Sequence, residues 1–345
     1  MGLMKAVRLM AHGAPGKMDF GEVPDPKPGS GDVVVRVKAC GLNHLDVWAE
    51  KGELPIRLEL PRTQGCEIAG EIAEVGADVK GWKAGDRVAV QSNIFCGKCE
   101  YCARGEESMC IANVILGVQI DGGFAEKVMV PERALVKLPQ GVDFKTSAGL
   151  SLAGSTAMHM LTDRAQVRKG DWVLVIAGAS GVGSAAIQIA RGLGGRVIST
   201  GSTPEKRKLA ADLGAEAVLD SGGANWPDEV RKLTGKRGVD VVVEHVGGDV
   251  LVQSLSCLAR GGTIVTCGAT AGSKVELDIW PLFVKQQRIV GSYGRNRSDL
   301  VKTLEWAASG KLKPVIQAML PLDKTAEAFR MMRERMVVGK VLVTP

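Results

Sequence analysis

The spacing of hydrophobic and polar positions changes once along this chain of 345 residues. As far as about Gly141, short apolar segments of the strand type are separated by clusters of Gly and Pro, which predicts a loop-rich, mostly antiparallel β domain. The strands expected in this first part are Lys5–Leu9, Val33–Lys38, Ile68–Val75, Arg87–Val90 and Phe124–Val130. After about Ser151, strand-like segments alternate with segments of helical period, and this alternation predicts a doubly wound parallel sheet.

The second part is expected to contain six strands, at Val173–Ile176, Arg196–Ser199, Ala217–Leu219, Val239–Val243, Thr263–Cys267 and Arg288–Gly291. Helices are expected between them, one beginning after a Thr203 cap and others at Trp226–Leu233 and Val250–Leu258. The last fifty residues return to a helix and a strand that should fold back onto the first domain. We therefore expect an α/β protein with a β-rich domain at 1–150, a doubly wound domain at 151–295 and a returning segment at 296–345.

A glycine-rich turn follows the first strand of the second domain. The apolar run before it is typical of a strand buried on both faces, and a helical pattern opens directly after it. Glycines let the turn bend tightly and approach a pyrophosphate, whose charge meets free N–H groups at the helix N-terminus. The dinucleotide site is expected to include Gly178, Ser180, Gly181, Val182 and Gly183, with Ser180 where the strict pattern has a second glycine. A glycine-rich turn without a ligand is the alternative.

Composition narrows the class of partner. Hydrophobic residues make up 45% of the chain and charged residues 24%, which is average for a globular protein. The formal charge of +6 comes without a long Lys/Arg run, and aromatic residues make up 4%, so we expect a small-molecule partner rather than a nucleic acid. Neither a signal peptide nor a membrane span is expected, and reduced cysteines in a cytoplasmic location follow from that.

Four of the eight cysteines lie within fifteen residues, namely Cys96, Cys99, Cys102 and Cys110. Two-residue gaps let successive thiolates converge on one tetrahedral ion, and the longer gap closes a loop back onto it. Four thiolates fill the coordination shell, so the lobe 96–110 predicts one structural zinc ion per subunit. The alternatives are four metal-free cysteines and a zinc ribbon for nucleic acid, and the neighbours Glu100, Glu106 and Glu107 oppose the ribbon.

The order of these features resembles the medium-chain dehydrogenase/reductase superfamily, which includes zinc alcohol dehydrogenases and quinone and enoyl reductases. The resemblance covers essentially the whole chain and rests on the segments Gly41–Asp46, Gly65–Gly70, Gly85–Val88, Cys96–Cys110, Gly122–Glu126 and Gly178–Gly183. It implies a GroES-like catalytic domain and a Rossmann domain, with the active site in the cleft between them. It also implies a homodimer or homotetramer, in which the last Rossmann strand near Ile289–Tyr293 pairs across an interface.

The resemblance breaks at the catalytic zinc of the alcohol dehydrogenases. Where that family has Cys, His and Cys ligands, this sequence has Asn43, Cys66 and Leu152. The donors that remain nearby for an altered zinc site are His44, Asp46, Cys66 and Glu67. Without a Lewis acid an alcohol is hard to oxidise, whereas hydride addition to a conjugated carbonyl moves charge onto an oxygen that hydrogen bonds can hold.

The favoured hypothesis is therefore an NADPH-dependent reductase of enone or quinone substrates that works without catalytic zinc. Asn43 is expected to orient the substrate carbonyl, and His44 and Asp46 to assist protonation, although a histidine that only pairs with Asp46 is the alternative. Cys66 fits either a small buried side chain or a reactive thiol, and Glu67 is expected to form a structural ion pair. A zinc alcohol dehydrogenase with altered ligands and a non-catalytic nucleotide-binding protein are the competing hypotheses.

NADP(H) is the coenzyme expected from the end of the second Rossmann strand. In NAD-dependent relatives this strand ends with an acid that binds the adenosine ribose, whereas here the strand leads into Gly201. Ser202, Lys206 and Arg207 offer a hydroxyl and two positive charges to a 2′-phosphate, with a solvated helix face as the alternative for the two basic residues. By resemblance, Gly268 lies beside the nicotinamide.

Overall fold

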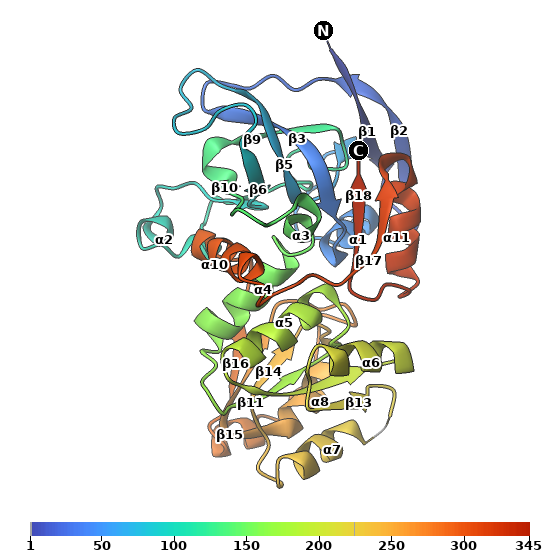
Figure 1. Ribbon diagram of the computed structural model, residues 1–345. Coiled ribbons are helices and arrows are strands. Elements are labelled where there is room, and N and C mark those ends of the chain that lie inside the picture. The colour runs from blue at the N-terminus through green and yellow to red at the C-terminus, as the bar shows by residue number, and fades with distance from the viewer. Residues whose placement is uncertain (1, 224) are drawn as a thin grey trace. The chain divides into compact units, whose positions relative to one another are not determined.

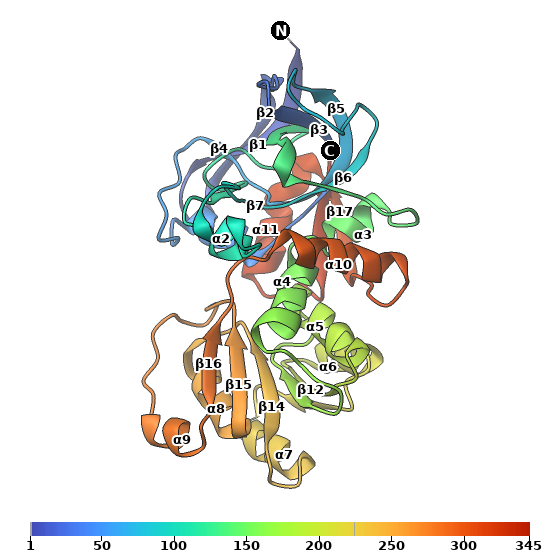
Figure 2. The same ribbon diagram turned by 90° about the vertical axis from the view of Figure 1, so that its left-hand side faces the viewer.

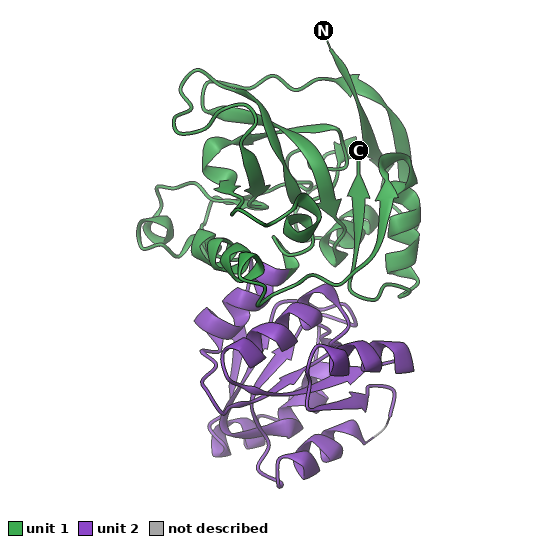
Figure 3. Cartoon of the chain, viewed as in Figure 1, with its two compact units in different colours: residues 1–153, 295–345 green, residues 154–294 purple. Residues whose placement is uncertain are grey.

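The computed structural model describes residues 2–223 and 225–345 and separates the chain into two units (Figure 3). Unit 1 consists of the chain up to Ala153 together with Arg295–Pro345, and unit 2 is Gly154–Gly294. The C-terminal segment thus belongs to the same unit as the N-terminal strands. In the described ranges, no helix is long and apolar enough to cross a membrane.

Unit 1 is built on a seven-stranded sheet in the order β10-β6-β5-β3-β18-β17, with β9 also paired to β3 (Figure 1). Its strands are β3 (Asp32–Gly41), β5 (Glu67–Val75), β6 (Arg87–Val90), β9 (Lys127–Pro131), β10 (Leu135–Lys137), β17 (Ile316–Pro321) and β18 (Lys340–Thr344). A three-stranded sheet contains β1 (Leu3–Ala11), β2 (Lys17–Pro24) and β4 (Arg62–Thr63), and a two-stranded sheet contains β7 (Asn93–Ile94) and β8 (Val114–Ile115). The strand expected at Phe124 begins at Lys127, and β2 and β17 were not expected.

The helices of unit 1 range from four to twelve residues and lie outside the strands of these sheets (Figure 1). They are α1 (His44–Lys51), α2 (Glu100–Ala103), α3 (Phe144–Ala148), α10 (Arg297–Ala308) and α11 (Thr325–Arg333), while α4 (Ala153–His159) crosses the boundary between the units in sequence. Helix α1 ends at Gly52, whose φ of 76° is the left-handed conformation that glycine adopts without strain. At its other end, α1 begins only two residues after β3, and the connecting residues are Leu42 and Asn43.

The last strand of the chain is internal to the large sheet. Strand β18 pairs antiparallel with β3, where Leu342 faces Gly41, and parallel with β17 on its other side. Helix α11 adds Phe329, whose ring meets that of Phe124 edge-on with the centroids 5.8 Å apart. Both rings are fully buried, so they contribute dispersion and hydrophobic energy to one core built from both ends of the chain.

Unit 2 contains one parallel sheet of six strands in the order β13-β12-β11-β14-β15-β16. The strands are β11 (Trp172–Val175), β12 (Arg196–Gly201), β13 (Ala217–Asp220), β14 (Val239–Glu244), β15 (Leu258–Thr266) and β16 (Arg288–Gly291). Its helices are α5 (Gly181–Gly192), α6 (Pro204–Asp212), α7 (Trp226–Leu233), α8 (Gly248–Cys257) and α9 (Ile279–Val284). All six expected strands are present, and the expected α8 ends at Cys257 because Leu258 already opens β15.

The strand order of unit 2 reverses once, between β11 and β14. Right-handed crossovers then place α5 and α6 on one face of the sheet and α7 and α8 on the other (Figure 2). At such a switch point the helices diverge beyond the carboxyl ends of the strands, which leaves room for a ligand there.

Candidate active site

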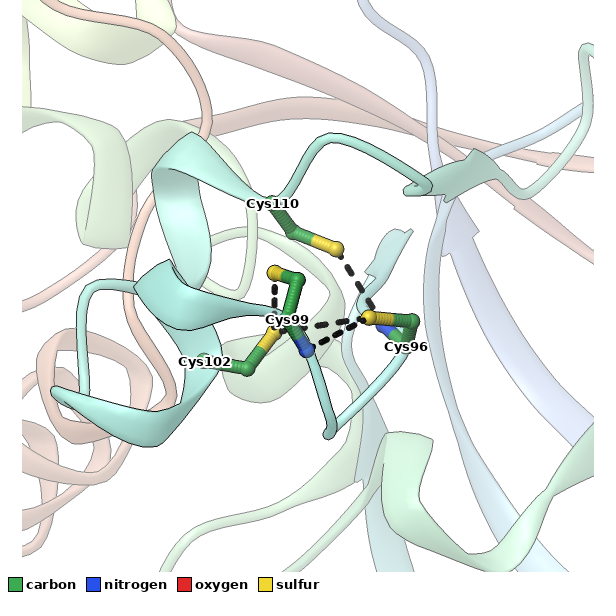
Figure 4. Close-up of side chains that lie close together, drawn as sticks. All are labelled: Cys96, Cys99, Cys102 and Cys110. Carbon is green, nitrogen blue, oxygen red and sulfur yellow. Dashed lines mark hydrogen bonds between the residues drawn. The ribbon is translucent and has the colours of Figure 1, made fainter.

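The four cysteines of the lobe converge on one point (Figure 4). Cys96 follows β7, Cys99 and Cys102 lie at the start and within α2, and Cys110 follows the turn Glu107–Met109. All four Sγ atoms lie within 4.8 Å of one another, with Cys99–Cys102 at 3.5 Å and Cys96–Cys102 at 3.9 Å. Zn–S bonds of about 2.3 Å in a tetrahedron require S···S distances of about 3.8 Å, so the donor set fits one zinc ion.

Backbone N–H groups donate hydrogen bonds to the sulfur atoms of the lobe. The amide of Cys96 donates to Cys110 Sγ at 3.2 Å, and the amide of Cys99 donates to Cys96 Sγ at 3.4 Å. The backbone N–H groups of Lys98 and Cys99 lower the pKa of Cys96, and the backbone N–H of Cys102 is the largest cause that lowers the pKa of Cys99 to about 6. Burial raises the pKa of Cys102 to about 12, so without a metal ion the protons of the lobe are divided unequally among the thiols.

A second cluster in unit 1 consists of Asn43, Asp46, Glu67 and Lys340, here called the polar cluster. The Lys340 ammonium is 2.7 Å from Glu67 Oε2, 2.7 Å from Asn43 Oδ1 and 2.7 Å from the carbonyl of Leu42. Asn43 Nδ2 donates to Glu67 Oε2 at 3.0 Å and to the Gly41 carbonyl at 3.2 Å. The ion pair is fully buried, with Glu67 at 0% and Lys340 at 3% exposure.

The carboxylate of Glu67 has no open acceptor direction toward a further ligand. Its other oxygen, Oε1, accepts from the backbone N–H groups of Leu152 at 2.6 Å and Ala153 at 3.1 Å. A Cβ at Gly41 would lie 2.5 Å from Glu67 Oε2, so only glycine fits where β3 passes the carboxylate. The ion pair expected for Glu67 is present, and its partner is Lys340.

Sequence reasoning did not include Lys340 in the site. Its partner Asn43 lies in the turn between β3 and α1, 297 residues away in sequence, and its partner Glu67 begins β5. One local signal existed, because Lys340 opens an apolar strand, Val341–Val343, that is buried completely. A charge at the start of such a strand must have a partner.

Asp46 and His44 sit on the same helix turn but in opposite surroundings. Asp46 is 1% exposed, and its two oxygens accept from the N–H groups of Asn43 at 2.9 Å and Gly65 at 3.2 Å. Burial raises the pKa of Asp46 to about 7 in spite of these donors. His44 is exposed, with its ring centroid 6.3 Å from that of Trp48. His44 is therefore open to a ligand, whereas Asp46 holds the helix start in place.

The donors left for an altered catalytic zinc site do not form a convergent group in the part of the chain that the structure describes. There, the lobe cysteines are the one group of three or more His, Cys, Asp or Glu ligand atoms close enough to hold a metal. Cys66 is fully buried, and burial raises its pKa well above the usual value, so the thiol stays protonated. This environment agrees with Cys66 as a small buried side chain.

In unit 2 the glycine turn has the geometry of a dinucleotide cradle. Ser180, at the position of the missing glycine, caps α5 by accepting from the Gly183 N–H at 2.9 Å. A Cβ at Gly178 would collide with Ser199 Oγ, and one at Gly183 would collide with the Ala177 carbonyl. The turn therefore needs these glycines for close packing, and it leads directly into the N-terminus of α5, where the sequence predicts the pyrophosphate.

His245, which has no assigned role in the sequence analysis, lies against this turn. It follows β14, and its Nε2 is 3.0 Å from the Ile176 carbonyl and 3.3 Å from Ser180 Oγ. Burial lowers the pKa of His245, so the imidazole is neutral near pH 7. Gly268 is also at this edge, since a Cβ there would lie 2.8 Å from the His245 carbonyl.

The expected 2′-phosphate residues follow β12 at the same edge of the sheet. Ser202 is exposed, and Lys206 and Arg207 are half-buried in the first turn of α6. The structure also places an acid here that the sequence analysis did not predict. Arg207 Nη1 is 2.9 Å from Oδ2 of Asp220, at the end of β13. One of the two cations expected for a phosphate therefore already has an anionic partner.

The two units together define a class, the zinc-binding dehydrogenases. Residues 181–309 match the model of the zinc-binding dehydrogenase family, and residues 29–140 match the alcohol dehydrogenase GroES-like domain. The chain belongs to the medium-chain dehydrogenase/reductase superfamily and is an oxidoreductase. The resemblance and the α/β fold class expected from the sequence are thereby confirmed.

The relatives differ in the reactions that their names give. Acryloyl-coenzyme A reductase of Sulfurisphaera tokodaii is 34% identical over 94% of this chain and 95% of its own. A solved NAD-dependent alcohol dehydrogenase is 40% identical, with a TM-score of 0.95 over 99% of this chain and all of its own. A 2-octenoyl-CoA carboxylase reductase, solved with NADP and 2-octenoyl-CoA, is 28% identical, with a TM-score of 0.90 over 99% of this chain and 87% of its own.

We predict close to one zinc ion per chain after extensive dialysis, measured by elemental analysis. Cys99→Ser should lower both the zinc content and the unfolding temperature, because the binding energy of the metal is part of the folding energy of the lobe. Cys66→Ser is the matched control and should keep the zinc. A ratio near two, or loss of zinc from the Cys66 variant alone, would contradict the assignment.

Lys340→Met should lower the free energy of unfolding by about 3–5 kcal/mol in urea titrations at pH 7, because Glu67 is then left buried and uncompensated. Lys208→Met removes an exposed pair with Asp212 and should cost less than about 1 kcal/mol. The double variant Lys340→Met/Glu67→Gln should regain part of the loss, since no lone charge remains. A Lys340→Met variant as stable as the wild type would show that the pair does not stabilise unit 1.

Proposed function

We propose that the protein is an NADPH-dependent reductase of conjugated carbonyl compounds, enone, quinone or enoyl thioester, that works without catalytic zinc. The observation that carries this proposal is the polar cluster. At the three positions where alcohol dehydrogenases hold zinc the chain has Asn43, Cys66 and Leu152, and the neighbouring Glu67 is committed to Lys340. The names of the acryloyl-CoA and 2-octenoyl-CoA reductases support a conjugated thioester as the first substrate to examine.

Reduction of such a substrate needs a hydride, which NADPH supplies when bound, and then a proton. Once the β-carbon is reduced, negative charge collects on the carbonyl oxygen and the α-carbon must be protonated. The exposed His44 is the group of this chain proposed to deliver that proton, because imidazole titrates near neutral pH.

Asn43 and Asp46 are proposed to act as positioning residues. Both amide hydrogens of Asn43 are donated to protein acceptors, so donation to a substrate carbonyl would require breaking one of those bonds. Asp46 fixes the start of α1 through the Asn43 N–H and fixes Gly65 beside it. Together they hold the backbone from which His44 projects.

The alternative is an alcohol dehydrogenase with an altered metal site. It is favoured by the 40% identity to the NAD-dependent alcohol dehydrogenase over nearly the whole chain. A substrate panel separates the two, since only the alternative predicts efficient turnover of unconjugated alcohols and aldehydes.

With NADPH as coenzyme, the purified protein should reduce acryloyl-CoA, crotonyl-CoA or a simple enone with kcat/KM at least ~10²-fold above that for saturated aldehydes of equal length. Disappearance of NADPH absorbance and identification of the saturated product provide the measurement. Equal turnover of saturated aldehydes supports the alternative, and coenzyme binding without any turnover would falsify both enzymatic proposals.

His44→Ala should lower kcat on the best of these substrates by ~10²–10⁴-fold, as expected for loss of a general acid. His12→Gln, at an exposed histidine bonded to the Ala49 carbonyl, is the matched control and should leave kcat unchanged. An unchanged kcat for His44→Ala from neutral to alkaline pH would show that water supplies the proton.

NADPH is the proposed coenzyme because β12 ends in Gly201, with the exposed Ser202 and the half-buried Lys206 beyond it. Gly201→Asp should weaken NADPH binding about tenfold or more relative to NADH, through repulsion of the 2′-phosphate. The control is Gly201→Ala, because any Cβ there lies 3.1 Å from the Arg207 backbone nitrogen and must displace it slightly. Equal dissociation constants of the wild type for NADPH and NADH would refute the preference.

A homodimer or homotetramer is also proposed, formed through the free edge of β16. Ile289 on β16 is 37% exposed, Tyr293 is 55% exposed, and the nearby α9 presents Trp280 at 68%. Sedimentation equilibrium should give a multiple of the monomer mass, and Ile289→Asp should reduce it. A monomer for the wild type would exclude this interface.

A further inference from the structure

Helix α6 and strand β13 lie side by side in unit 2, and their ends are joined by one ion pair (Figure 1). Arg207 Nη1 is 2.9 Å from Asp220 Oδ2 and 3.2 Å from the carbonyl oxygen of Gly201, to which it donates. Gly201 and Asp220 are also register partners on β12 and β13. The guanidinium therefore lies over the end of β12, where a Rossmann domain holds the adenosine ribose.

The same position would make Arg207 a ligand of a 2′-phosphate. A phosphate attracts the guanidinium through charge and through parallel N–H donors, which are the interactions that Asp220 already receives. We infer that Asp220 competes with the coenzyme 2′-phosphate for Arg207 and so limits the preference of this protein for NADPH over NADH. The inference rests on the NADP(H) site proposed above and names a residue that sets its selectivity.

Asp220 is suited to act as a fixed competitor rather than a mobile one. Its second oxygen, Oδ1, accepts from the Gly222 N–H at 2.9 Å, which ties the carboxylate to the turn after β13. The side chains of Arg207 and Asp220 are 27% and 51% exposed, so water screens the pair and its strength is moderate. A phosphate can therefore draw Arg207 away, at a cost that NADH binding does not incur.

Asp220→Asn tests this with little disturbance, because the amide oxygen can still accept from the Gly222 N–H. We expect the dissociation constant for NADPH, measured by calorimetry without substrate, to fall about two- to fivefold. The constant for NADH should stay within error. Asp212→Asn is the matched control. Asp212 is an exposed acid on α6, the helix that also contains Arg207, and its ion-pair partner is Lys208, at 2.6 Å. It removes an equal charge and should not change the ratio of the two constants.

A double-mutant cycle decides whether Arg207 carries the effect. Arg207→Gln should weaken NADPH binding, and in that background Asp220→Asn should give no further gain. A gain that persists without Arg207 would show simple repulsion of the phosphate by Asp220 and overturn the competition. Weaker NADPH binding by Asp220→Asn would overturn it too, because it would mean that Asp220 positions Arg207 for the phosphate.

The two proposals fail separately. If wild-type protein binds NADH as tightly as NADPH, the NADPH preference is wrong, yet the shift of the ratio by Asp220→Asn still supports the competition. If NADPH is preferred and the ratio does not move in the Asp220 variant, the coenzyme proposal stands and the competition is rejected.

Discussion

The buried contact between Lys340 and Glu67 is the constraint on which unit 1 depends. Lys340 begins β18, the strand that lies between β3 and β17, and Glu67 begins β5 on the other side of β3. An ammonium out of water is costly unless its donors are satisfied, and here three oxygen acceptors at 2.7 Å satisfy them. The pair therefore fixes the C-terminal strand in the sheet and, through the same atoms, fixes Asn43.

That constraint also occupies the polar atoms of the site. Asn43 and Glu67 direct theirs to Lys340 and to backbone groups. The positive charge of the cluster is thus part of the polypeptide. Because all donors of this ammonium are engaged, our proposal assigns the protein a substrate that itself delocalises charge.

Stability and chemistry are divided among different parts of the chain. The lobe of four cysteines is closed on itself and needs only zinc to be complete. The carboxyl edge of the sheet in unit 2 brings together the glycine turn, His245 and the Arg207–Asp220 pair, all of which follow strand ends. In our proposal, selectivity between coenzymes at that edge depends on the competition of Asp220 and a 2′-phosphate for Arg207.

Features that arise from neighbours in sequence could be predicted without a structure. The rhythm of β14, β15 and β16, the cap of α6 at Thr203, and the convergence of Cys96 with Cys110 depend on local spacing, because backbone geometry links nearby residues directly. The ends of elements were less certain, as at Leu258, where a helical pattern gives way to β15 because the parallel partner β14 provides a ladder.

What only the tertiary structure decided are contacts between side chains far apart in the chain. Lys340 and Asn43 are 297 residues apart in sequence, and Arg207 meets Asp220, the last residue of β13. No periodicity or spacing encodes such pairs, because they follow from strand order and from the need of a buried or half-buried charge for the nearest counter-charge. The sequence by itself predicted the fold class, the cysteine lobe and the glycine turn, because these depend on local pattern and spacing. Only the folded chain brings Lys340 to Glu67 and Asp220 to Arg207.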